Sequence, residues 1–232
     1  MTTEIKAPPV EGDWLGARLR RKEDQRLVTG NGAYLADINM RGMLHAMFVL
    51  SDSAHAKILS INAAEASKLP GVIKIYTGED IREKIKPMPQ PVVTPNLTAE
   101  YPTFWPLAVD KVKYHGEPVA LVVARDRYLA EDAAELIEIE YEDLPPILNP
   151  ESALKQDSPL VHEESESNEI FGMTFTGGLT EEEQRKNEQE VNELFKKADH
   201  VIKERFVVHR TGLTPMEPRG ALCDWNESDG LT

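Results

Sequence analysis

The chain has 232 residues, of which 41% are hydrophobic and 28% are charged, and its formal net charge is -14. These proportions are ordinary for a globular protein, and the length is enough for one large domain or two small ones. The negative charge argues against nucleic acid or an anionic membrane surface as a partner, because both require a basic face. No stretch reaches the ~20 apolar residues of a membrane-spanning helix. The N-terminus shows no secretory signal, so membrane insertion is not expected and the expected location is cytoplasmic.

The single cysteine, Cys223, cannot form an internal disulfide or supply an iron–sulfur cluster, which requires several thiolates. It lies in the apolar run 221–225, which predicts a small buried side chain rather than a nucleophile. The six histidines show no metal-binding spacing, so no metal site is predicted.

In chain order, residues 1–20 are predicted to be a loose leader. The run Met43–Leu50 is continuously apolar, which is typical of a strand buried on both faces. Asn62–Leu69 is predicted as a short helix that is capped by Asn62 and ended by Pro70 and Gly71. Further short elements are expected as strands at 58–61 and 72–76 and as a helical turn at 77–81.

Six prolines between Pro87 and Pro106 predict an extended loop, because proline lacks an N–H donor. Pro118–Ala124 follows as an apolar strand, and Asp126 is placed to cap the next helix. Residues 137–142 alternate between apolar and acidic side chains, which indicates a strand with one solvent-facing side. The prolines of 144–147 make the best domain boundary.

Beyond residue 150 the chain becomes polar and acidic. A helix is predicted from Thr180 to Phe195, with Glu183 completing a capping box. Strands are predicted at 200–208 and 219–225, the second followed by a hairpin turn. The mixture of strands and short helices indicates an α+β or α/β fold.

Two stiff turns carry the unusual polar residues. His115 precedes Gly116 in the turn Lys113–Pro118, where its ring could reach a partner surface. Glu217 and Arg219 lie between prolines and a glycine in the segment 214–220. That charged pair could order a subunit contact or line a cavity, and it could equally belong to a simple surface turn.

Taken together, these segments resemble the molybdenum hydroxylases, the family of xanthine dehydrogenases, aldehyde oxidases and aerobic carbon monoxide dehydrogenases. The resemblance extends from about Arg18 to Thr232, and its pieces occur in the family's order. They are Arg26–Tyr34 with Asp37, Ser51–Ile58, Leu69–Val72, Thr77–Asp80, Val112–Ala120, Ala130–Glu135, Tyr141–Pro145 and Pro215–Gly220.

The resemblance implies an α+β fold in which an a/b hammerhead domain with a mixed sheet and short helices spans 21–147. An incomplete α/β segment of the molybdopterin-binding domain follows at 148–232. It also implies oxidative hydroxylation with water as the oxygen source. The complete subunit would hold molybdenum on molybdopterin cytosine dinucleotide, and iron–sulfur and FAD subunits would complete a hetero-oligomer.

The family's catalytic and pterin-binding segments lie beyond the part that this sequence matches, so no catalytic, cofactor-binding or metal-binding residue is carried over. The chain is expected to be a truncated form, a gene fragment or one piece of a split large subunit, and to be inactive alone. The alternative is a stand-alone interaction module that reuses the fold. Structural or interface roles are expected for the motif residues His115, Gly116, Glu117, Pro118, Met216, Glu217, Pro218 and Arg219.

Overall fold

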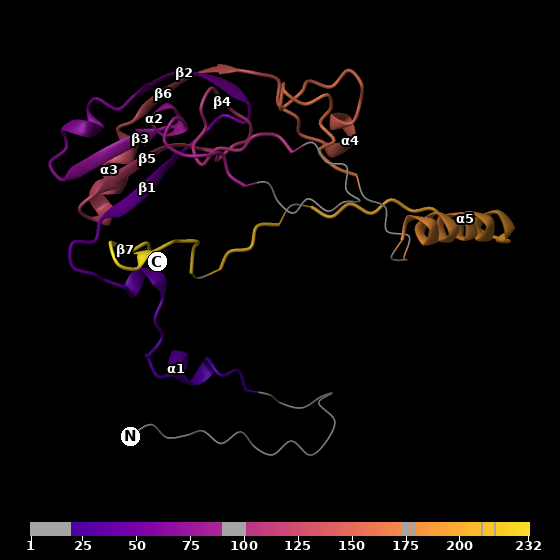
Figure 1. Cartoon of the computed structure of the whole chain (residues 1–232), viewed down its shortest axis with the longest axis horizontal. Helices are drawn as coiled ribbons and strands as arrows, with labels where there is room; N and C mark the ends of the chain where they lie inside the picture. Colours follow the sequence, from indigo (N-terminus) through magenta and orange to yellow (C-terminus); the bar gives the residue numbers. More distant parts are fainter. Residues whose placement is uncertain (1–19, 90–100, 173–176, 178–179, 210, 216) are drawn as a thin grey trace. The chain divides into compact units, whose positions relative to one another are not determined.

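The computed structural model describes residues 20–89, 101–172, 177, 180–209, 211–215 and 217–232. The described residues divide into two compact units, one within 42–206 and the other within the segments 20–41 and 207–232. Figure 1 shows their helices and strands. Each unit is described by itself.

A three-stranded antiparallel sheet, sheet A, organises the larger unit. Its strands are β1 (His45–Leu50), β5 (Pro118–Ala124) and β3 (Val72–Thr77), in the order β1-β5-β3. The central position of β5 follows from its composition, because a run of valines and alanines suits a strand that has neighbours on both sides. The predicted strands at 72–76 and 118–124 are confirmed.

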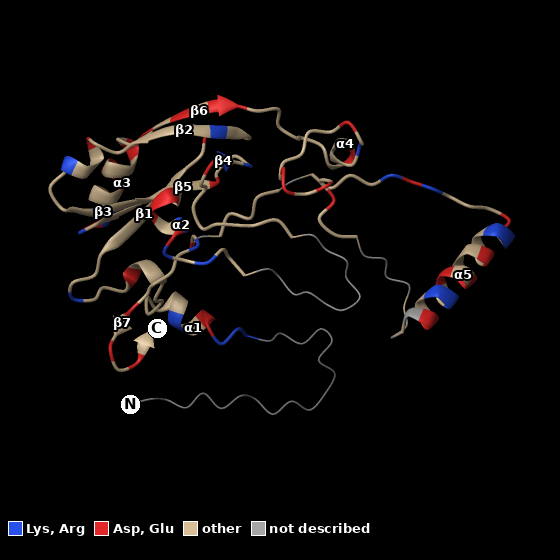
Figure 2. Cartoon of the chain, turned by 45° about the horizontal axis from the view of Figure 1, so that its top comes forward, with Lys and Arg blue, Asp and Glu red and all other residues tan. Residues whose placement is uncertain are grey.

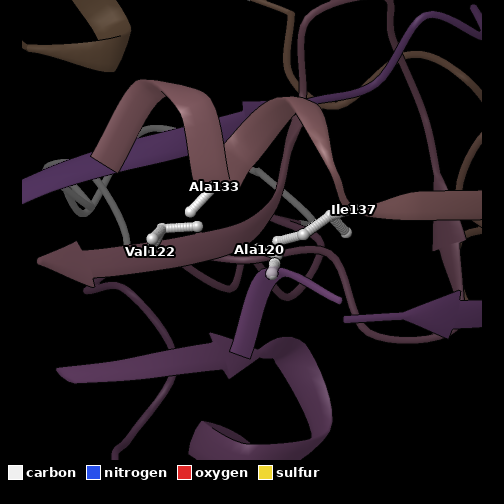
Figure 3. Close-up of a cluster of buried hydrophobic side chains, with 5 residues drawn as sticks. Ala120, Val122, Ala133 and Ile137 are labelled. Carbon is white, nitrogen blue, oxygen red and sulfur yellow. The ribbon is translucent and has the colours of Figure 1, made fainter. Parts of the chain in front are cut away.

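One face of sheet A is covered by helix α3 (Arg127–Glu135). The Asp126 carboxylate caps this helix by accepting a hydrogen bond from the backbone N–H of Leu129 at 2.9 Å, as the sequence predicts. Ala133 of α3 and Val122 of β5 are both fully buried and face each other across the layer (Figure 3). The core therefore lies between α3 and the central strand.

Part of the other face of sheet A is exposed within the described residues. Side chains alternate along β1, so that Phe48 and Leu50 are about half exposed, at 51% and 55%. The prediction that 43–50 is buried on both faces is therefore wrong. An apolar run shows that a strand forms, but it does not show that a second layer is present to cover it.

A second three-stranded sheet, sheet B, has the order β4-β2-β6. It contains β4 (Lys111–Val112), β2 (Ala56–Asn62) and β6 (Glu138–Asp143), all antiparallel. Glu138, Glu140 and Glu142 of β6 are exposed, as the alternating pattern predicts, and colour this strand red in Figure 2. A small core that includes Ala56, Val112 and Val119 lies beneath.

Short helices connect the strands. Helix α2 (Gly78–Arg82) begins at Thr77, whose hydroxyl and backbone form a capping box with Asp80. The predicted helix at 62–69 is wrong in extent, because only a 3-10 turn, η2 (Ala66–Lys68), forms. Asn62 accepts from the N–H of Ala64 instead, in a local turn that competes with helix formation.

The remainder of this unit contains helices α4 (Pro150–Ala153) and α5 (Glu181–Lys197). The predicted capping box is confirmed: the Thr180 hydroxyl accepts from the N–H of Glu183, and the Glu183 carboxylate accepts from the N–H of Thr180. The predicted strand at 200–208 is wrong, since no described residue in this stretch is in a strand. Alternation alone makes no strand when no neighbouring backbone pairs with it.

The smaller unit contains α1 (Asp24–Val28), the 3-10 turn η1 (Leu35–Asp37) and a hairpin of β7 (Trp225–Asn226) and β8 (Gly230–Leu231). The predicted hairpin turn is present, but the predicted strand at 219–225 is reduced to its last residue and continues to Asn226. Cys223 is exposed, so the prediction that it is buried is wrong. A hairpin with only two paired residues on each strand supplies no layer to bury it.

Candidate functional site

The loop Ser51–His55 joins β1 of sheet A to β2 of sheet B and connects several sequence motifs. Ser51 is almost completely buried, with 2% of its surface exposed. Its hydroxyl accepts from the N–H of Ser53 at 3.1 Å and donates to the Ser53 carbonyl at 2.9 Å, which stabilises the loop locally. The Ser51 side chain therefore closes a local turn within the loop.

The turn 113–118 is tied to this loop. Gly116 has φ +86°, a left-handed conformation that favours glycine, and its N–H donates to the Ser51 carbonyl at 2.8 Å. In return the Ser51 N–H donates to the Glu117 carbonyl at 2.9 Å. The Glu117 carboxylate closes the turn by accepting from the N–H of Lys113 at 2.5 Å. The Glu117 side chain thus stabilises its own turn.

Burial is the main cause of the pKa shifts of Glu117 and Tyr141, which lie near this loop and turn. Burial raises the pKa of the Glu117 carboxyl, although the hydrogen bond from the Lys113 N–H and the Lys113 charge oppose the rise. Burial also raises the pKa of the Tyr141 phenol, and the charges of Asp52 and Glu117 add to the rise. A carboxyl group with a raised pKa costs free energy when it is ionised, so Glu117 is a pH-sensitive point of the turn.

His55 ties the same loop to the end of β6. It is 6% exposed, and its Nδ1 lies 3.0 Å from the carbonyl oxygen of Pro145. Because a carbonyl oxygen only accepts, Nδ1 must carry the proton. The backbone carbonyl of His55 accepts from the N–H of Leu144 at 2.8 Å, and Ser53 donates to the Asp143 carboxylate at 2.8 Å. The loop therefore holds the last residues of the 141–145 motif.

A cavity of about 330 Å³ lies beside β4. Its walls include cations and carboxylates in equal number, together with aromatic rings at 104 and 105. The charged residues are Lys57, Arg82, Asp110, Lys111, Lys113, Glu117, Glu163 and Glu164. With its charges balanced in this way, the cavity has no net preference for an anion or a cation.

The segment 162–164 packs against that cavity. The Lys111 ammonium lies 3.0 Å from the Glu163 carboxylate, and the Lys111 side chain is only 14% exposed. The ring of His162 meets the ring of Phe104 edge-on at 5.5 Å. Burial, with the charge of Lys113, lowers the pKa of His162, so this ring is neutral at neutral pH. These contacts hold residues 162 and 163 against Lys111 of β4 and against Phe104.

Two residues of the second motif, Glu217 and Gly220, contact Leu35 within the smaller unit. The Glu217 carboxylate accepts from the N–H of Leu35 at 2.8 Å, at the first residue of η1. Gly220 packs so closely on Leu35 that an added Cβ would lie 2.4 Å from Leu35 Cδ2. Glu217 therefore caps a short helix that lies 182 residues earlier in the chain.

The predicted site residues therefore fall into two groups. His115, Gly116, Glu117 and Pro118 form one turn in the larger unit, with the His115 side chain exposed. Glu217, Pro218 and Arg219 belong to the smaller unit and are exposed, while Met216 lies outside the described residues. Whether any of them contacts a partner stays a prediction.

Sequence reasoning did not single out Ser51, His55, Lys111 or Glu163. Ser51 and His55 belong to the family segment Ser51–Ile58, but nothing in its residue types indicates which of them is buried. Lys111 and Glu163 had no signal, because charged residues are common throughout this sequence.

Among the described residues, no group of three or more His, Cys, Asp or Glu side chains is arranged to hold a metal ion. The same residues include no helix with the length and apolar character that crossing a bilayer requires.

Two family models match the chain. Residues 29–145 match the aldehyde oxidase and xanthine dehydrogenase a/b hammerhead domain, and residues 162–232 match the molybdopterin cofactor-binding domain. The chain belongs to the aldehyde oxidase and xanthine dehydrogenase family. The α+β hammerhead fold and the molybdenum hydroxylase relationship inferred from the motifs are thereby confirmed.

Members of this family with curated functions are similar over almost the whole chain. The nicotine 6-hydroxylase large subunit of Paenarthrobacter nicotinovorans is 38% identical over 224 residues, covering 95% of this chain and 26% of its own length. The carbon monoxide dehydrogenase large chain of Afipia carboxidovorans is 35% identical over 235 residues, covering 99% of this chain and 27% of its own length. The chain thus spans about a quarter of the length of these relatives.

Solved structures of family members agree. The Cu,Mo-containing CO dehydrogenase superposes with a TM-score of 0.55 at 37% identity, covering 71% of this chain and 19% of that chain. Quinoline 2-oxidoreductase from Pseudomonas putida 86 gives a TM-score of 0.51 at 41% identity, covering 60% of this chain and 18% of that chain. The fold is therefore shared with these two enzymes at 37% and 41% sequence identity.

Proposed function

We propose that this chain serves as the N-terminal portion of a molybdenum hydroxylase large subunit and has a structural and assembly role. The observation that carries the proposal is the succession of hammerhead and molybdopterin-domain matches in one chain. The complete subunit would catalyse oxidative hydroxylation with water as the oxygen source.

The two matched ranges support a domain boundary near residue 147. In this division residues 1–20 are a leader, 21–147 form the hammerhead domain, and 148–232 begin the molybdopterin-binding domain. The prolines at 145 and 146 suit a boundary, because they cannot donate backbone hydrogen bonds to either side.

The proposed cofactors are those that the family resemblance implies. A single cysteine cannot hold an iron–sulfur cluster, which is bound by several thiolates. The described residues also offer no cluster of metal ligands. From the family resemblance we propose that molybdenum, on molybdopterin cytosine dinucleotide, is held by the rest of the large subunit, and that the iron–sulfur clusters and FAD are on partner subunits. By itself the chain would not turn over.

The surface of the larger unit supports an assembly role. In the antiparallel register of sheet A, Phe48 lies opposite Leu121, which in turn lies opposite Tyr76. These three side chains form an apolar row on the face that α3 does not cover. Ile202 and Phe206 are also exposed, at 85% and 88%. A partly exposed apolar row such as Phe48, Leu121 and Tyr76 is typical of interaction sites.

The proposed partners are the remainder of the large subunit together with iron–sulfur and FAD subunits, in a hetero-oligomer. The relatives include proteins described as a large subunit, a large chain and a complex subunit, which supports this arrangement. The cytoplasm is the proposed compartment, supported by the single cysteine, which leaves no internal disulfide to form.

The proposal is tested by affinity purification of the tagged chain from its native source, followed by mass spectrometry of the intact complex. Recovery with polypeptides that carry the missing molybdopterin-domain segments and with iron–sulfur and flavin subunits is expected. Recovery of the chain alone would instead favour a stand-alone interaction module that reuses the hammerhead fold.

A further inference from the structure

Within the described residues, hydrogen bonds to Ser53 and His55 hold the chain where it leaves the hammerhead domain, and His55 makes two of them. After β6 ends at Asp143, the Leu144 N–H donates to the His55 carbonyl and the Pro145 carbonyl accepts from the His55 ring. We propose that His55 is a positioning residue that fixes the path by which the chain leaves β6 toward the molybdopterin-binding segment.

The two prolines limit the hydrogen bonds that can hold the backbone here, so the contact between the His55 ring and the Pro145 carbonyl carries more of the restraint. Pro145 and Pro146 have no backbone N–H, so only their carbonyl oxygens can be tied by hydrogen bonds. Among the described residues, 146–148 have no hydrogen-bond partner, and the next backbone hydrogen bond is donated by Ser152 to Asn149. The His55 ring therefore makes the last polar contact before helix α4.

The His55 ring is itself held in place, so it can fix the direction of the backbone at Pro145. Its own loop is held by the Ser51 hydroxyl and by the exchange of hydrogen bonds between Ser51 and the turn at 116–117. The ring is buried, so water does not compete for the Pro145 carbonyl from the side of the ring. Nε2 is buried without a partner among the described residues. Nδ1 is thus the ring atom that holds the Pro145 carbonyl, and with it the backbone that leaves β6.

This assignment predicts a specific pattern of rescue. In asparagine the side-chain amide nitrogen is bonded to Cγ, as Nδ1 is in histidine, so His55→Asn retains a donor near the same place. In glutamine the nitrogen lies one bond farther out, near the position of Nε2. His55→Leu fills the space without any donor. The inference does not depend on the proposed function, because it concerns only the path of the backbone.

The test is residue-resolved amide hydrogen exchange, by NMR, on the full chain and its variants. In His55→Leu the Leu144 amide is expected to exchange about tenfold faster, the factor that corresponds to ~1.4 kcal/mol. The Val122 amide, in the central strand of sheet A, is expected to change by less than about twofold. His55→Asn is expected to restore most of the protection at Leu144, and His55→Gln is not.

Three results would overturn the inference. They are unchanged exchange at Leu144 in His55→Leu, an equal increase at Val122, and equal rescue by asparagine and glutamine. An equal increase at Val122 would mean that His55 supports the whole fold rather than the exit. If His55→Leu does not fold, the comparison of His55→Asn with His55→Gln still decides the matter, because both keep a polar amide.

Discussion

Substitution of Val122 by alanine probes the packing of α3 on sheet A. Val122 is fully buried on the central strand and faces Ala133 of the helix (Figure 3). Removing two buried methyl groups costs about 1.6 kcal/mol in transfer free energy, at ~0.8 kcal/mol for each. The residual cavity raises the expected loss of unfolding free energy to about 2–3 kcal/mol.

The matched control is the next residue, Val123. It has the same side chain on the same strand but points to the open face, where it is only half-buried. Val123→Ala is expected to cost less than about 1 kcal/mol, because much of its surface already contacts water.

Urea denaturation followed by circular dichroism measures both variants against the unchanged chain. Equal losses for Val122→Ala and Val123→Ala would refute the reasoning. They would mean that Val122 and Val123 are equally buried, contrary to the full burial of Val122 and the partial exposure of Val123.

Gly78→Ala is expected to destabilise the chain by about 1–3 kcal/mol in urea denaturation, because a Cβ at this position would lie 2.1 Å from the Ala108 backbone oxygen. Gly212→Ala, with nothing within 4 Å, is the control, and equal effects of the two would contradict the close packing. Glu117→Gln keeps an acceptor for the Lys113 N–H and removes the buried charge. Because the pKa of Glu117 is raised in the folded chain, its ionisation lowers stability as pH rises from 4.5 through the folded pKa. Urea midpoints between pH 4 and 7 should therefore show a gain for Glu117→Gln that grows with pH, and a gain independent of pH would count against the burial of this charge. Thr180→Ala removes the cap of α5 and is expected to cost about 1 kcal/mol of helix stability, seen as reduced helicity in a peptide spanning 180–198; unchanged helicity would exclude the capping role.

The sequence was most informative where structure is determined locally. The succession of β5, α3 and β6 follows from an apolar run, the Asp126 cap and an acidic alternation, all within 26 residues (118–143). The α5 capping box is equally local, because Thr180 and Glu183 are three residues apart.

The features that sequence reasoning missed depend on distant partners. The His55 ring meets a carbonyl 90 residues away, and Glu217 caps a helix 182 residues away. Whether Phe48 is covered depends on a second layer, which no pattern within the strand can report. The alternation at 200–208 was misleading for the same reason, since a strand requires a neighbouring backbone to pair with it.

The most direct test of the central claim is the molybdenum content and turnover of the purified 26.0 kDa chain, compared with those of the complex recovered from its native source. We predict substoichiometric molybdenum and no dye-coupled aldehyde oxidation for the isolated chain, with molybdenum recovered in the complex. One molybdopterin for each isolated chain, or turnover by that chain, would contradict the proposal that the reactive centre lies in the rest of the large subunit.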